Sequence, residues 1–128
     1  MADALFDTSV FIDYYRGDSR ARELVEQIIA GTLTGAYSPI SVFELWLGNM
    51  GQAEASTYED LLVLLEEAVF DGHVAKRAAN MLQSVSAQDR QRLLGDAFIA
   101  ATAAERGETI YTRNVRDFQN LNVNVSTY

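Results

Sequence analysis

The chain has 128 residues, of which 48% are hydrophobic and 22% charged, and this predicts one globular domain spanning residues 1–128. The formal net charge of −8 argues against a protein that coats nucleic acid through its overall field, and the lack of cysteine excludes disulfides, thiolate metal sites and cysteine nucleophiles. No apolar run could span a bilayer and no signal peptide is recognisable, so we expect a cytoplasmic protein without a membrane partner.

The first conspicuous stretch is residues 5–13, which begins with an apolar run typical of a buried central strand. Asp7 interrupts the run, and the hydroxyl residues Thr8 and Ser9 are suited to begin a helix that continues through Tyr15. Open parallel α/β sheets bind ligands at the carboxyl ends of their strands, which makes Asp7 a candidate site residue. A helix N-cap is the alternative interpretation of Asp7, and the local sequence favours neither.

The next segment predicts a helix with Ser19 as its N-cap and its end at Gly31, followed by a strand over residues 32–37. Pro39 is expected to close this strand, because proline cannot donate a hydrogen bond to a neighbouring strand. Ser41 and Glu44 then have the spacing of a capping box, with the serine at the N-cap and the glutamate at N3. Capping and a role in a site are equally good local explanations of Glu44.

The second half of the chain continues the alternation of helices and strands. The predicted elements are a helix from Thr57, a very short strand at residues 68–70, helices over 74–82 and 94–106, strands over 109–112 and 123–126, and a turn with a short helix over 113–120. Gly107 is the expected C-cap of the helix over 94–106, and His73, the single histidine, is interpreted as a surface residue. The alternation predicts an α/β fold with a parallel or mostly parallel sheet covered on both faces.

Three further acids are placed to join Asp7. Glu44 follows the second strand, Asp96 lies early in the helix over 94–106, and Asp117 follows the strand over 109–112, so all four are expected at one edge of the sheet. Asp96 enters an apolar helix face, where an unpaired carboxylate is costly, although the helix dipole offers part of a structural explanation. Clustered carboxylates without Cys or His select hard cations, so the pattern predicts Mg²⁺ or Mn²⁺.

Four short sequence blocks follow one another over nearly the whole chain. They are DTSV at 7–10 with ID at 12–13 and RG at 16–17, SVFEL at 41–45, DAFIAATA at 96–103, and TRN at 112–114 with DF at 117–118. With these blocks the chain resembles PIN-domain proteins, and among them the VapC toxins of bacterial and archaeal type II toxin–antitoxin pairs. The resemblance implies a three-layer α/β/α fold around a small, mostly parallel central sheet.

The same resemblance implies a metal-dependent ribonuclease whose catalytic and metal-binding residues are Asp7, Glu44, Asp96 and Asp117. Asp7 and Asp96 are the expected direct ligands, whereas Asp117 matches the position that varies most among relatives. The carboxylates of Glu44 and Asp117 are candidates for orienting or deprotonating the attacking water.

Several residues match positions around that site. Ser9 and Thr112 fall where relatives place a hydroxyl at the site rim, with Asn114 nearby, and Asp13 is interpreted as a helix residue with a structural partner such as Arg16. The chain departs from the expected pattern in lacking a basic patch. The candidates for RNA phosphate contacts are Arg16, Arg113 and Arg116, each of which also has a structural interpretation.

The function that the resemblance implies is endonucleolytic hydrolysis of RNA phosphodiester bonds, as the toxin of a VapBC-type pair. An RNA-processing PIN nuclease without an antitoxin, or an inactive PIN scaffold for protein interaction, is the alternative. A haloacid dehalogenase-type phosphatase would need a second Asp where Ser9 stands, and a receiver domain a lysine after a late strand, whereas Lys76 is mid-helix. The expected partners are RNA, an antitoxin whose tail enters the acidic groove, and a second copy of the chain.

Overall fold

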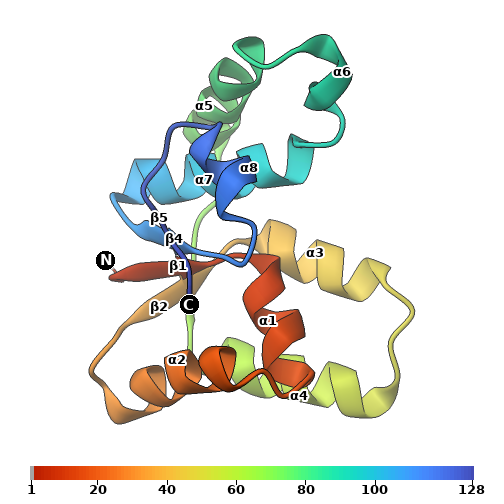
Figure 1. Ribbon diagram of the computed structural model, residues 1–128, viewed down its shortest axis with the longest axis vertical. Helices are drawn as coiled ribbons and strands as arrows, with labels where there is room; N and C mark the ends of the chain where they lie inside the picture. Colours follow the sequence, from red (N-terminus) through yellow and green to blue (C-terminus); the bar gives the residue numbers. More distant parts are fainter. Residues whose placement is uncertain (1) are drawn as a thin grey trace.

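The computed structural model describes residues 2–128 (Figure 1). The strands are β1 (Ala4–Phe6), β2 (Gly35–Tyr37), β3 (Glu66–Glu67), β4 (Thr109–Tyr111) and β5 (Val125–Ser126). The helices are α1 (Thr8–Tyr15), α2 (Ser19–Ala30), α3 (Pro39–Leu47), α4 (Gln52–Val63), α5 (Gly72–Gln83), α6 (Ala87–Arg90), α7 (Leu94–Arg106) and α8 (Val115–Gln119). In this part of the chain no helix is long and apolar enough to cross a membrane.

The sheet has five strands within the described residues, all parallel, in the order β3-β2-β1-β4-β5. β1 is central and fully buried, as its apolar run predicts. Phe6 is in register with Tyr37 of β2 on one side and with Tyr111 of β4 on the other. The residues that follow these three strands therefore emerge side by side at the carboxyl edge, where the strand order changes direction.

Two hydrophobic cores lie on opposite faces of the sheet, because successive side chains of a strand point to opposite faces. Leu5 packs into the core beneath α5, α7 and α8, whereas Phe6 packs into the core with α1, α2 and α4 (Figure 1). α3 runs along the edge between them and contributes Ile40 to the first core and Leu45 to the second. The three-layer α/β/α architecture is thus confirmed, and its sheet is entirely parallel.

The capping-box interpretation of Ser41 and Glu44 is wrong. The N-cap of α3 is Ser38, whose Oγ accepts a hydrogen bond from the Ile40 N–H at 3.1 Å, and Pro39 occupies the first turn of the helix. Proline is suited to that position because its missing N–H would have no partner there. Ser41 is therefore buried within the helix, and the carboxylate of Glu44 is left for another role.

Other boundaries moved by a few residues. The short strand lies at Glu66–Glu67 rather than at 68–70. The Ala68 N–H still donates to the Tyr37 carbonyl of β2 at 2.8 Å, and the chain then leaves the sheet, with Val69 68% exposed. The helix predicted from Thr57 begins earlier, at Gln52. The N-cap of α2 is Asp18 and not Ser19, because the Asp18 carboxylate accepts hydrogen bonds from the N–H groups of the first turn. α7 has the predicted bounds, and its Gly107 C-cap is confirmed by a φ of 70°.

Candidate active site at the carboxyl edge of the sheet

Asp7 lies directly after β1 and is only 3% exposed. It is the N-cap of α1, and its Oδ2 accepts hydrogen bonds from the Ser9 hydroxyl at 2.9 Å and the Thr112 hydroxyl at 2.8 Å. All of these contacts end on Oδ2, including the longer one from the Ser9 N–H at 3.4 Å. The capping and site interpretations of Asp7 are therefore compatible, since one oxygen is held by the protein while Oδ1 is left for a ligand.

The two hydroxyl groups connect Asp7 to the backbone that follows β4. The Arg113 N–H donates to Ser9 Oγ at 3.1 Å, and the Asn114 N–H donates to Thr112 Oγ1 at 2.9 Å. Ser9 is 4% exposed and Thr112 fully buried, so both are buried together with Asp7 and neither lies at an open rim. Each hydroxyl accepts a hydrogen bond from a backbone N–H after β4 and donates one to Asp7, directly after β1. These bonds fix the orientation of the carboxylate.

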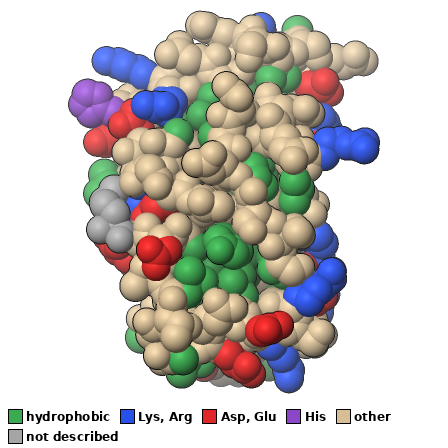
Figure 2. All heavy atoms as spheres, turned by 60° about the vertical axis from the view of Figure 1, so that its left-hand side comes forward, with side chains coloured by type: hydrophobic (Ala, Val, Ile, Leu, Met, Phe, Trp, Pro, Cys, Tyr) green, Lys and Arg blue, Asp and Glu red, His purple; other side chains and the backbone are tan. Residues whose placement is uncertain are grey.

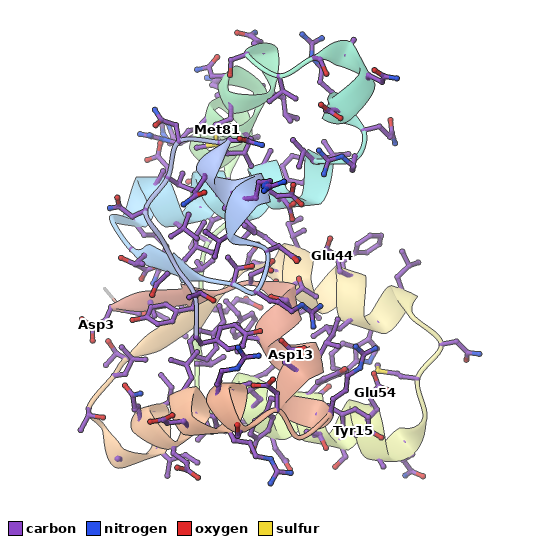
Figure 3. The ribbon with its side chains drawn as sticks, in the orientation of Figure 1. Asp3, Asp13, Tyr15, Glu44, Glu54 and Met81 are labelled. Carbon is purple, nitrogen blue, oxygen red and sulfur yellow. The ribbon has the colours of Figure 1, made fainter. Side chains whose placement is uncertain are left out.

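Glu44 reaches the same region from α3. Its Oε1 accepts a hydrogen bond from the Thr8 hydroxyl at 2.6 Å, and Thr8 in turn lies 2.9 Å from the Ser41 hydroxyl. A Cβ atom at Gly95 would lie 2.6 Å from Glu44 Oε2, so the glycine allows the carboxylate to approach the first turn of α7. Figure 3 shows Glu44 on the side of α3 that faces α7. Partial burial and the charge of Asp7 raise the pKa of Glu44, against the lowering effect of the Thr8 hydrogen bond.

Asp96 lies in the first turn of α7, next to Gly95. Its pKa is raised from an ordinary 3.8 to about 7, first by burial and then by the charges of Asp7, Asp117 and Glu44. The structure thus brings Asp7, Glu44 and Asp117 close enough to Asp96 to oppose the ionisation of its carboxyl group.

Among the ion pairs of residues 2–128, Asp117, in the first turn of α8, is the one acid of the four with a cationic partner. Arg92 Nη1 lies 3.1 Å from Asp117 Oδ1, and Nη2 lies 3.6 Å from Oδ1 of Asp89. Arg92 also lowers the pKa of Asp96, against the larger effects of burial and of the other acids. Sequence reasoning missed Arg92, since it lies in a polar stretch without a motif and only the fold brings it beside the acids.

The three arginines predicted to contact RNA lie in different surroundings. Arg113 forms an ion pair with Asp13, which also accepts a hydrogen bond from the Tyr128 hydroxyl. The structural partner of Asp13 is therefore Arg113 and not Arg16, because Asp13 faces the segment after β4 (Figure 3). Arg16 and Arg116 are exposed. Asn114 is exposed as well, and its backbone N–H donates to Thr112 Oγ1.

The donor atoms of the site suit a hard divalent cation, because they are carboxylate oxygens without thiols or imidazoles. Among the described residues, no three Asp, Glu or His side chains are spaced so as to hold an ion as they stand. The Thr8 hydroxyl donates a hydrogen bond to Glu44 and Arg92 donates one to Asp117, so two of the four carboxylates already have partners. Burial and, after it, the charges of three neighbouring acids raise the pKa of Asp96, and a cation bound beside this carboxylate would favour its ionised form.

Comparison with known proteins gives one family and several solved structures. A family model of the PIN domain matches residues 4–123. VapBC2 from Rickettsia felis, solved bound to a DNA fragment from its promoter, is 19% identical with a TM-score of 0.75, and the match covers 98% of both chains. FitAcB from Neisseria gonorrhoeae is 24% identical with a TM-score of 0.73, covering 95% of both chains.

A third similar structure is described as a toxin–antitoxin complex from Klebsiella pneumoniae. It is 28% identical with a TM-score of 0.70, and the match covers 90% of this chain and 89% of that chain. At 19% and 24% identity, the first two structures show a shared fold alone. A comparison with curated protein sequences gave no match.

Proposed function

Because the chain belongs to the PIN domain family, a family of nucleases, we propose that it is a divalent-metal-dependent endoribonuclease that hydrolyses RNA phosphodiester bonds. The observation that carries the proposal is the convergence of Asp7, Glu44, Asp96 and Asp117. Burial, and after it the charges of the other three acids, raise the pKa of Asp96 to about 7. A purely structural cluster of acids would be expected to carry paired cations, whereas within the described residues Arg92 forms an ion pair with Asp117 and with none of the other three acids.

Asp7 and Asp96 are the proposed direct ligands of Mg²⁺ or Mn²⁺, and Glu44 and Asp117 complete the site. The cation, when bound, supplies Lewis-acid activation of water and stabilises charge on the phosphate. Oε1 of Glu44 is occupied by Thr8, so Oε2 is the atom that orients the attacking water and accepts its proton. The raised pKa of Glu44 makes its carboxylate a better base than an ordinary glutamate.

RNA attraction then depends on local features, because the net charge of the chain is −8. On the face that Figure 2 shows, acidic and basic side chains lie interspersed. We therefore propose that cationic side chains close to the acids contact the phosphates, and not a broad basic surface on that face.

Removal of the metal tests the function most simply. Protein treated with chelator is expected to leave a single-stranded RNA uncut, and added Mg²⁺ or Mn²⁺ is expected to restore cleavage. The products are measured by gel electrophoresis of an end-labelled RNA. Cleavage that persists at the same rate in excess chelator would contradict the proposal.

Thr112→Val is expected to reduce cleavage by about 10- to 100-fold, because the hydroxyl orients Asp7. Stability should fall by about 1–3 kcal/mol, since a buried carboxylate oxygen and the Asn114 N–H both lose a partner. Thr102→Val is the matched control, because Thr102 is also fully buried and bonds only the Phe98 carbonyl of its own helix. Equal cleavage rates in the two variants would remove Thr112 from the site.

We further propose that the enzyme is the toxin of a VapBC-type pair, which is supported by similar structures described as VapBC and toxin–antitoxin complexes. This function would place the protein in the cytoplasm. The presence of all four acids favours an active nuclease over a PIN scaffold without activity. An RNA-processing nuclease is the remaining alternative, and a small antitoxin gene beside this one would separate the two.

The antitoxin tail is proposed to lie against α3 beside the acids. Phe43 and Leu47, on the same helix as Glu44, are 62% and 72% exposed and can receive an apolar helix of the partner, while Trp46 is 38% exposed. A guanidinium of the tail would pair with the carboxylates. A tail peptide should therefore inhibit cleavage, and replacing its arginine should weaken inhibition by about tenfold or more. Unchanged inhibition would mean that the tail acts by steric cover alone.

We also propose that residues 1–128 act as a single nuclease domain and that two copies form a homodimer. The exposed apolar side chains outside α3, such as Ile29 and Val63, support association. Light scattering at micromolar concentration should then give twice the 14.2 kDa of one chain, and a mass of one chain would exclude the dimer.

A further inference from the structure

Arg92 is a cationic residue beside the four acids. It lies between α6 and α7, and its guanidinium contacts Asp117 at 3.1 Å and Asp89 at 3.6 Å. The side chain is 54% exposed, so it can leave either partner without breaking a packed core. Arg113, by contrast, is tied to Asp13, whose side chain is 7% exposed.

While Arg92 donates a hydrogen bond to Asp117 Oδ1, that oxygen is not free to bind a divalent cation. Building on the proposed function, we infer that Arg92 competes with the divalent cation for Asp117 and, once displaced, binds a phosphate of the RNA substrate. In the cation-free protein Arg92 neutralises part of the repulsion among the acids. When a cation takes over that role, the guanidinium stays beside Asp89 at the mouth of the site.

The chemistry of each partner supports this exchange. A divalent cation carries twice the charge of a guanidinium and interacts more strongly with a carboxylate. The planar fork of an arginine suits a phosphate, with which it forms two parallel hydrogen bonds. Arg92 is thus a positioning residue for Asp117 before the cation binds and a contact residue for the substrate afterwards.

The test uses Arg92→Gln and Arg92→Lys, with Arg77→Gln as the matched control. Arg77 is similarly exposed and pairs with Glu105 at 2.9 Å, at the other end of α7 from Asp96. Mn²⁺ affinity is measured by calorimetry without RNA, and KM and kcat are measured separately with RNA.

Arg92→Gln is expected to bind Mn²⁺ at least about threefold more tightly, because the competing charge is gone. Its KM for RNA should rise about tenfold with a smaller change in kcat, because the phosphate contact is lost. Arg92→Lys, which keeps the charge without the fork, should retain the Mn²⁺ affinity of the wild type and show an intermediate KM. Arg77→Gln should match the wild type in all three quantities.

Unchanged or weaker Mn²⁺ binding by Arg92→Gln, or an unchanged KM, would overturn the inference while leaving the proposed function intact. A wild-type protein that neither binds Mn²⁺ nor cleaves RNA would overturn both. Circular dichroism of each variant confirms that the comparison is made between folded proteins.

Discussion

Asp7→Asn is expected to lower RNA cleavage by about a thousandfold or more while leaving the fold intact. Asparagine caps a helix as well as aspartate does, so α1 should still begin at Thr8. The amide oxygen can also accept the hydrogen bonds that Ser9 and Thr112 donate to Oδ2. The substitution therefore removes the charge of the carboxylate and little else.

Asp18→Asn is the matched control for Asp7→Asn. Asp18 is the N-cap of α2, where its Oδ1 accepts from the Arg20 and Ala21 N–H groups at 2.9 and 3.0 Å. Both variants keep a helix cap and lose one negative charge, but only Asp7 lies among the acids. Equal cleavage by the two variants, measured on the same RNA, would assign Asp7 a capping role alone.

Asp96→Asn is expected to abolish cleavage to a similar degree and, in chelator at neutral pH, to stabilise the protein. The ionised carboxylate of Asp96 is disfavoured by burial and by three neighbouring acids, and the amide removes that penalty. After allowance for solvent screening, the gain in the free energy of unfolding is on the order of 1–2 kcal/mol. Denaturant unfolding in excess chelator measures it.

The gain should depend on pH in one direction. The pKa of Asp96 is about 7 in the folded protein and near 3.8 when unfolded, so the unfolded chain loses the proton first as the pH rises. Asp96 therefore costs no stability below about pH 4, an increasing amount between about pH 4 and 7, and its full amount above that range. Asp60→Asn, at an exposed position of α4, should show no such pH-dependent gain. A loss of stability in Asp96→Asn would favour a structural role at the start of α7.

Sequence reasoning was most successful where a pattern is repeated along the chain. The buried run of β1, the apolar and small residues of α7 and the alternation of elements were enough for the three-layer fold. Acids that follow strands were enough to place Asp7 at the carboxyl edge, because parallel strands share one direction.

The contacts between side chains far apart in sequence were not predictable in this way. The capping box at Ser41 was a reasonable local pattern, but Ser38 with Pro39 makes a better start for α3. The partner of Asp13 and the role of Arg92 depend on pairs separated by 100 and 25 residues, which no local period reveals. The hydrogen bond from Thr112 to Asp7 likewise follows from the pairing of β1 with β4, which the residues adjacent to Thr112 in sequence do not reveal.

Titration of Mn²⁺ into chelator-stripped protein tests most directly whether the four acids form a metal site. The wild type should show saturable binding, and Asp7→Asn and Asp96→Asn should each bind at least about tenfold more weakly. Asp18→Asn should bind as the wild type does. Wild-type protein without saturable Mn²⁺ binding, or Asp96→Asn protein that binds as tightly as the wild type, would contradict a metal-dependent site at this edge of the sheet.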